Sequence, residues 1–283
     1  MMPRFSQWHS AWRRWNGAEP GGWTRAILIC STIVLVALTA VFWLYGFLGP
    51  PGWRVSHDDL AIYTEATRRL LAGGSWYLER QLNGPYQIQH GDVLFPPVAA
   101  WFFALWLVLP TWSFVVVPVA LTAWAVARMR PSVWTWPLLA LCVLWPMFGL
   151  KVLRSNPNVW VMAAVAMGLL YRWPGAFILA KPSMVPFALI GSRSRGWWAV
   201  AALLLVGSLP VLADTLIYPT VVFNGEGGGI LYSLPDLPFA LLPVIAWVGR
   251  RGLRGGSTPL GPDPEPGVSS NGFSLRTKGL TRL

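Results

Sequence analysis

The sequence predicts an all-α membrane protein, a polytopic helix bundle with about eight apolar segments. Hydrophobic residues make up 54% of the 283-residue chain and charged residues only 12%, which is too apolar for an ordinary soluble domain. Apolar blocks follow one another from residue 25 to residue 249. Residues 1–25 hold four arginines against one glutamate, and residues 250–283 hold six basic residues against two acidic ones. The positive-inside rule therefore predicts that both termini are cytoplasmic, and it makes the net charge of +11 a topology signal rather than a sign of nucleic-acid binding.

The two ends of the chain flank a membrane domain of residues 25–249. Residues 1–24 are polar, basic and rich in tryptophan, which is typical of a cytoplasmic arm at the membrane interface. The nearly uncharged run 25–48 is long enough to cross about 30 Å of hydrocarbon and lacks the cleavage site of a signal peptide. We expect it to be a retained first helix that runs outward. Residues 250–283 are dense in Gly, Pro and Ser, which predicts a disordered basic cytoplasmic tail.

Two polar intervals are predicted to lie outside the membrane and to face each other. The first outer loop, residues 50–93, carries five acidic residues against four arginines, and the second, residues 214–236, carries three acidic residues and no basic one. Within the first loop, residues 59–71 repeat apolar side chains at helical spacing before the stop signal Gly73–Gly74. We expect this amphipathic helix to lie on the outer membrane face.

The remaining apolar blocks do not fit a simple series of crossings. Several are shorter than the roughly 20 residues that a straight span needs. Basic clusters follow successive blocks, so full crossings would place alternate clusters outside, against the positive-inside rule. One or more blocks are therefore expected to be tilted, broken or re-entrant, and the block with Lys181-Pro182 and Pro186 is the first candidate. The blocks are residues 94–109, 112–127, 133–150, 159–171, 174–190, 197–212 and 237–248.

Three motifs, in this order, resemble glycosyltransferase family 87, whose members are multispanning enzymes of the GT-C superfold. The first begins with Asp59-Leu-Ala-Ile-Tyr63, continues through Leu71-Ala-Gly-Gly74 and Tyr77, and ends with Phe95-Pro-Pro97 at the start of a helix. It looks like the family's first outer loop. Asn156-Pro-Asn158 is similar to the family's Gly-Gln-x-Asn element, with Ser155-Asn156 in place of Gly-Gln, and Lys181-Pro-Ser183 is similar to its Lys-Pro motif.

The resemblance covers about residues 25–212 and implies an activity. A hexosyltransferase of this kind moves a sugar, with mannose as the first expectation, from a polyprenyl-phosphate donor to a lipid or glycan acceptor on the outer face of the membrane. It implies a multi-pass protein of a bacterial plasma membrane that works with membrane lipids and needs no cofactor and no nucleic acid.

The chemistry of such a transfer assigns roles to particular residues. A carboxylate has to take the proton of the acceptor hydroxyl, and we expect Asp59 to do so, with Asp58 raising its pKa by like-charge repulsion. The leaving phosphate needs cations, which Lys181 supplies from within the bundle. Arg54 heads the alternates, with Arg68, Arg69 and Arg154 behind it. The other expected substrate-binding residues are Tyr63, Tyr77, Asn156 and Asn158.

Structural interpretations stand beside each assignment. Asp58 and Asp59 also suit a helix N-terminus, Tyr63 suits an interfacial anchor, and Lys181 suits a snorkelling side chain. Asn156 and Asn158 also suit a turn and a cap. Two other functions remain open. The first is a non-catalytic membrane protein, either a carrier or a degenerate lipid-binding relative. The second is a hydrolase with a divalent metal on His57, Asp58, Asp59, His90 and Asp92, although no fixed ligand spacing supports that metal.

Overall fold

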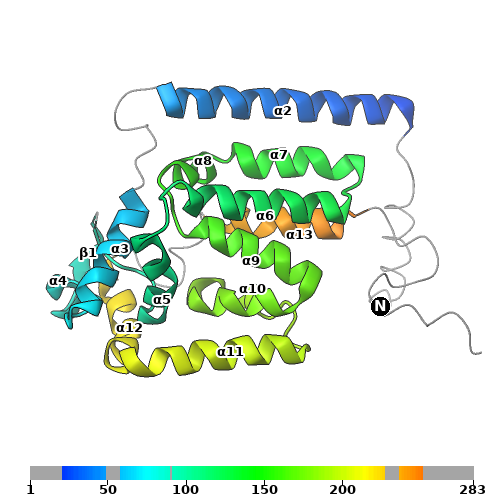
Figure 1. The fold of residues 1–283 in the computed structure, drawn as a ribbon. Coiled ribbons are helices and arrows are strands. Elements are labelled where there is room, and N and C mark those ends of the chain that lie inside the picture. Colours follow the sequence, from blue (N-terminus) through cyan, green and yellow to red (C-terminus); the bar gives the residue numbers. More distant parts are fainter. Residues whose placement is uncertain (1–20, 49–57, 90, 227–235, 251–283) are drawn as a thin grey trace, which may run out of the picture. The chain divides into compact units, whose positions relative to one another are not determined.

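The computed structural model describes residues 21–48, 58–89, 91–226 and 236–250, and this part of the chain is almost entirely helical. The predicted all-α class is therefore confirmed. Figure 1 shows most of the helices lying side by side with roughly parallel axes. The α-helices are α2 (Gly22–Leu48), α3 (Asp58–Leu71), α4 (Glu79–Leu82), α5 (Ala100–Phe103), α6 (Ser113–Met129), α7 (Trp136–Leu144), α8 (Pro146–Leu153), α9 (Asn158–Tyr171), α10 (Val185–Ala188), α11 (Arg195–Ser208), α12 (Leu212–Asn224) and α13 (Leu237–Val248).

Short elements connect these helices. The 3₁₀ helices are η2 (Pro97–Ala99), η3 (Ala104–Leu107), η4 (Val133–Thr135), η5 (Trp173–Ala180), η6 (Pro182–Met184) and η7 (Leu209–Val211). Strands β1 (Tyr86–Gln87) and β2 (Gly225–Glu226) form one parallel pair.

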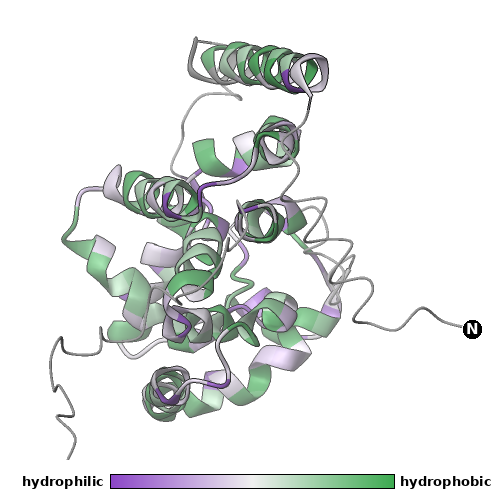
Figure 2. Cartoon of the chain, turned by 90° about the vertical axis from the view of Figure 1, so that its right-hand side faces the viewer, coloured by the Kyte–Doolittle hydropathy of each residue, from purple (hydrophilic) through white to green (hydrophobic). Residues whose placement is uncertain are grey.

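Two helical stretches among the described residues are long and apolar enough to cross a membrane, and a bent pair makes a third if it forms one span. Helix α2 has 27 residues, about 40 Å at 1.5 Å per residue, and its apolar side chains are exposed almost all round. Helices α11 and α12 join through η7 into the second stretch, Arg195–Asn224. Most of the chain drawn in Figure 2, including α2 at the top, has hydrophobic colouring. Apolar side chains exposed on this scale indicate a lipid environment.

Proline explains why the expected apolar blocks are divided. The expected block 133–150 is bent by 59° at Trp145, where Pro146 begins α8. The block 174–190 is broken as the sequence predicted, into η5, η6 and α10, with Lys181 between η5 and η6. The other blocks give shorter apolar helices, and eight complete spans are not seen among the described residues.

The apolar face of helix α3 packs inside the protein rather than against lipid. Its residues Leu60, Tyr63 and Ala66 are buried, and the helix packs against α5 and η3. The periodicity predicted the apolar face correctly, but helices of the same chain cover that face instead of lipid.

The two intervals expected to be outer loops do contact each other. Backbone pairing joins Tyr86 to Gly225, and the Tyr86 hydroxyl donates a 3.0 Å hydrogen bond to the carbonyl of Val221. The Asp214 carboxylate accepts hydrogen bonds from the Ser75 hydroxyl and from the backbone N–H of Trp76. The second interval is not simply a loop, however, because α12 occupies it as far as Asn224.

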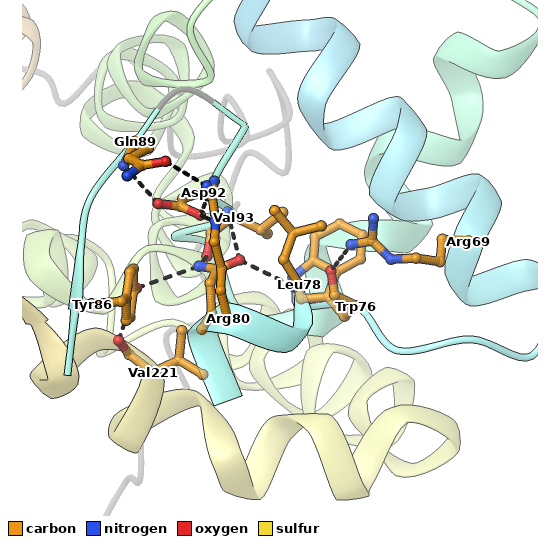
Figure 3. A network of polar contacts seen from close by, with 10 residues as sticks. Arg69, Trp76, Leu78, Arg80, Tyr86, Gln89, Asp92, Val93 and Val221 are labelled. Carbon is orange, nitrogen blue, oxygen red and sulfur yellow. Dashed lines mark hydrogen bonds and ion pairs between the residues drawn. The ribbon is translucent and has the colours of Figure 1, made fainter. Parts of the chain in front are cut away.

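A polar network fixes the fold of residues 75–93 (Figure 3). The buried Asp92 carboxylate accepts two hydrogen bonds from the Arg80 guanidinium, at 3.0 and 2.7 Å, and one from the backbone N–H of Gln89. The buried Gln81 amide donates to the Val93 carbonyl at 3.1 Å. Figure 1 shows this segment, α3 and α12 at the same end of the bundle, which we call the site end.

Four arginines lie at the opposite end of the bundle. Helices α6 and α9 run in the same direction, since the indole N–H of Trp160, at the start of α9, donates a hydrogen bond to the carbonyl of Phe114, at the start of α6. The rings of Trp124 and Tyr171 stack near their far ends. The carbonyl of Gly249, after α13, accepts a backbone hydrogen bond there from Ser132 at 2.8 Å. We call this the basic end, because it carries Arg128, Arg130, Arg172 and Arg250.

Candidate functional site

A tight turn between α8 and α9 forms the foundation of the candidate site. Ser155 is completely buried and has a φ of 57°, a left-handed conformation that is uncommon for a residue other than glycine. It reverses the chain, so that the backbone N–H of Asn156 donates a 2.8 Å hydrogen bond to the carbonyl of Lys151. The side-chain Oδ1 of Asn156 accepts the backbone N–H of Asn158 at 3.0 Å. This bond fixes the amide orientation and leaves the Asn156 NH₂ group to donate elsewhere.

That NH₂ group donates to the carboxylate of Asp59. The distance from Asn156 Nδ2 to Asp59 Oδ2 is 2.6 Å, and the Asp59 backbone N–H donates to the Arg154 carbonyl at 3.1 Å. The sequence therefore folds the start of α3 directly onto the α8–α9 turn.

Burial raises the pKa of Asp59 above its ordinary value. The Asn156 hydrogen bond, Arg154 and Lys151 oppose the rise, and Asp58 adds only the smallest contribution to it. Asp58 therefore acts in the expected direction, but desolvation of Asp59 is the larger effect. Asp58 itself is partly buried at the first position of α3.

Lys181 lies beyond Asn158 in the same chain of contacts. Its ammonium group donates to Asn158 Oδ1 and to Asp236 Oδ2, the latter at 3.0 Å, and it lies 5.6 Å from the centre of the Phe95 ring. The Lys181 side chain is only 3% exposed, and Asn158 is 2% exposed. A charge this deeply buried is stable only when paired, and Asp236 supplies the pair.

The structure adds two residues to this site that the sequence assignments missed. Asp236, 1% exposed, binds Lys181 through one carboxylate oxygen and Lys151 through the other. Burial alone would raise the pKa of Asp236, but Lys181 and Lys151 outweigh it and hold the pKa below its ordinary value. In the sequence, Asp236 and Lys151 counted only as charges that report topology. The available signal was that each is a charged residue at the edge of an apolar block.

We call these six residues the polar cluster: Asp59, Lys151, Asn156, Asn158, Lys181 and Asp236. It joins an aspartate at the start of α3 to two lysines through amide and carboxylate groups. Such an arrangement places a partly buried base close to preformed cationic groups, which suits proton removal beside a developing anion.

The aromatic residues predicted to bind substrate lie mainly in the core. The Tyr63 ring is buried, stacks on Phe103 at 4.6 Å and meets the edge of Phe95 at 5.3 Å. Phe95 in turn lies against Lys181, so Tyr63 supports the polar cluster from behind. Tyr77 is 1% exposed, with its hydroxyl 3.5 Å from the Phe95 carbonyl.

Some predicted residues lie outside the described part of the chain. These are Arg54, and His57 and His90 of the considered metal site. Among the described residues, no group of three or more His, Cys, Asp and Glu side chains is placed to hold a metal ion.

Comparison with known proteins adds no relative to this description. No protein-family model matches the chain, and neither a curated protein nor a solved structure matches it. The functional argument therefore depends on the polar cluster and on the motifs within the sequence.

Proposed function

We propose that this protein is a multi-pass membrane glycosyltransferase that uses a polyprenyl-phosphate sugar as donor and a lipid or glycan as acceptor. The observation that carries the proposal is the polar cluster, in which hydrogen bonds join a raised-pKa aspartate, a buried lysine and a partly exposed lysine from four separate segments. The motifs that resemble glycosyltransferase family 87 supply Asp59, Asn156, Asn158 and Lys181 to this same cluster. The site end would face the outside of a bacterial plasma membrane, with the basic end and both termini in the cytoplasm.

The proposed reaction is a single displacement at the anomeric carbon. The acceptor oxygen attacks this carbon and forms the new glycosidic bond, while its proton passes to the Asp59 carboxylate. The bond from the anomeric carbon to the phosphate oxygen breaks, and its electron pair leaves with the polyprenyl phosphate. The configuration of the sugar is inverted, and no electron donor or acceptor is needed.

The environment of Asp59 supports its role as the base. Burial raises the pKa of this carboxylate, which makes it a better proton acceptor than a solvated aspartate. The Asn156 amide holds the carboxylate in place through Oδ2. Lys181 and Lys151 provide positive charge for the phosphate that leaves.

The test is sugar transfer by the purified full-length protein in lipid nanodiscs, with labelled polyprenyl-phosphate hexoses and a membrane extract as the source of acceptor. General base catalysis contributes about 10²–10⁴ in rate, so Asp59→Asn is expected to reduce product formation at least about a hundredfold. Glu65→Gln is the matched control, because Glu65 lies exposed on the same helix and pairs only with Arg68 among the described residues.

Glu65→Gln should retain the wild-type rate. Wild-type transfer by a folded Asp59→Asn variant would reject Asp59 as the base. If the wild-type protein transfers none of the hexoses, the non-catalytic alternative, a lipid-binding protein or carrier, takes precedence.

A further inference from the structure

Asp236 holds two ammonium groups of unequal accessibility. The Lys181 side chain is 3% exposed and the Asp236 side chain 1%, whereas the Lys151 side chain is 25% exposed. Each lysine contacts a different oxygen of the carboxylate. Lys151 is therefore the member of this group of three that water, or another anion, can reach.

Lys151 can leave Asp236 at a lower cost than an ordinary buried ion pair would impose. Removing the sole partner of a buried charge is strongly unfavourable because the remaining charge is uncompensated. Asp236 would still be paired with Lys181 at 3.0 Å after Lys151 had moved away. The two ammonium groups also repel each other across the shared carboxylate, and their separation relieves that repulsion.

The position of Lys151 brings its positive charge near enough to Asp59 to act on it. Lys151 and Arg154 both act on the Asp59 carboxylate electrostatically, and both lie where α8 ends. The Lys151 carbonyl accepts the N–H of Asn156, whose side chain binds Asp59. An anion that takes Lys151 from Asp236 is thus brought toward the proposed catalytic carboxylate.

We propose that Lys151 exchanges Asp236 for a single phosphate group of the lipid donor, so that Asp236 acts as a resident counter-ion that the substrate displaces. This inference rests on the proposed function and names the group at its site that receives the phosphate of the donor. The ammonium of Lys151 matches the single negative charge of a phosphodiester, and Arg154, at the end of α8, adds positive charge for the second negative charge that appears when the sugar leaves.

The test measures binding rather than turnover. Farnesyl phosphate is titrated into the full-length protein in phosphatidylcholine nanodiscs without any sugar, and affinity is followed by intrinsic tryptophan fluorescence. Farnesyl phosphate is expected to bind. Lys151→Gln is expected to weaken farnesyl phosphate binding at least tenfold, and Lys151→Arg should recover most of that loss. Arg128→Gln removes an exposed charge from the basic end and should change nothing.

Asp236→Asn distinguishes exchange from simple positioning. If the substrate displaces Asp236, removing this competitor should tighten farnesyl phosphate binding severalfold. If Asp236 holds Lys151 in place for the anion, the variant should bind more weakly, and the exchange is refuted. Unchanged binding by a folded Lys151→Gln variant also refutes it.

The outcome for this site is separable from the outcome for the proposed function. Farnesyl phosphate binding that depends on Lys151, without any sugar transfer, would support the anion site and contradict the glycosyltransferase. Sugar transfer that proceeds equally well in Lys151→Gln would support the enzyme and contradict the exchange.

Discussion

Lys151 and Lys181 share the buried carboxylate of Asp236. Substitutions of the two lysines should therefore have strongly non-additive effects on the free energy of unfolding. In Lys181→Met, Asp236 keeps Lys151, so the expected loss of unfolding free energy is about 1–3 kcal/mol, the cost of the hydrogen bonds removed. In Lys151→Gln, Asp236 keeps the buried Lys181, and the loss should be about 1 kcal/mol or less because Lys151 is partly exposed.

The double variant leaves Asp236 buried without either lysine. Uncompensated charges of this kind cost about 3–5 kcal/mol, in addition to the hydrogen bonds lost at Asn158. The double variant should therefore be less stable than the sum of the single variants by at least about 1 kcal/mol. Adding Asp236→Asn to the double variant should recover much of that excess, because a neutral amide replaces the unpaired carboxylate.

The assay is denaturant-induced unfolding of the full chain in mixed detergent micelles, followed by fluorescence of its 19 tryptophans. All four variants and the wild-type protein are compared under the same detergent composition. Additivity within about 0.5 kcal/mol would show that the two lysines do not depend on a common partner. A triple variant that is no more stable than the double variant would lead to the same conclusion.

Two further predictions concern the pKa of the proposed base, Asp59, and the backbone conformation at two glycines. Because burial raises the pKa of Asp59, transfer activity should be lost as the pH falls through a value above that of an ordinary aspartate. Asn156→Ala should move this acid limb of the kcat/KM profile to still higher pH, since the amide stabilises the ionised form; an unmoved limb would contradict the assignment. Gly191→Ala should prevent stable folding, since Gly191 has a φ of 86° and a Cβ there would lie 2.1 Å from the Arg172 carbonyl oxygen. Gly73→Ala has a similar φ but open space, so thermal unfolding should show a loss of only about 1–2 kcal/mol, and equal losses would refute the steric argument.

Four residues of the site could be suggested from the sequence because their chemistry stands out in an apolar chain. Asp59 and Lys181 are charges that an apolar chain retains at a cost, and Asn156 and Asn158 are turn-forming residues beside a proline. The structure brings all four into one hydrogen-bonded chain. Their order along the chain suggested a common site, because the resemblance relates each motif to the same reaction.

Other features depend on contacts that local patterns do not encode. The pairing of Lys151 with Asp236 spans 85 positions, and neither residue lies in a recognisable motif. The stripe on α3 predicts an apolar face but does not say whether lipid or α5 covers it. Pro146 is compatible with either a break or a helix start, so the bend at Trp145 could not be placed from the sequence.

The distribution of basic residues connects the topology with the proposed chemistry. Arg130, Arg172 and Arg250 lie at the basic end, as the positive-inside rule requires if this end faces the cytoplasm. Lys151 and Arg154 lie at the site end, where the same rule disfavours them. The bend before α8 and the left-handed Ser155 place both residues near enough to Asp59 to act electrostatically on its carboxylate. At the same end, Glu65 and Asp92 pair with Arg68 and Arg80. In the proposed function the phosphate of the donor is the corresponding counter-ion of Lys151 and Arg154, so a role in anion binding accounts for positive charge at this turn.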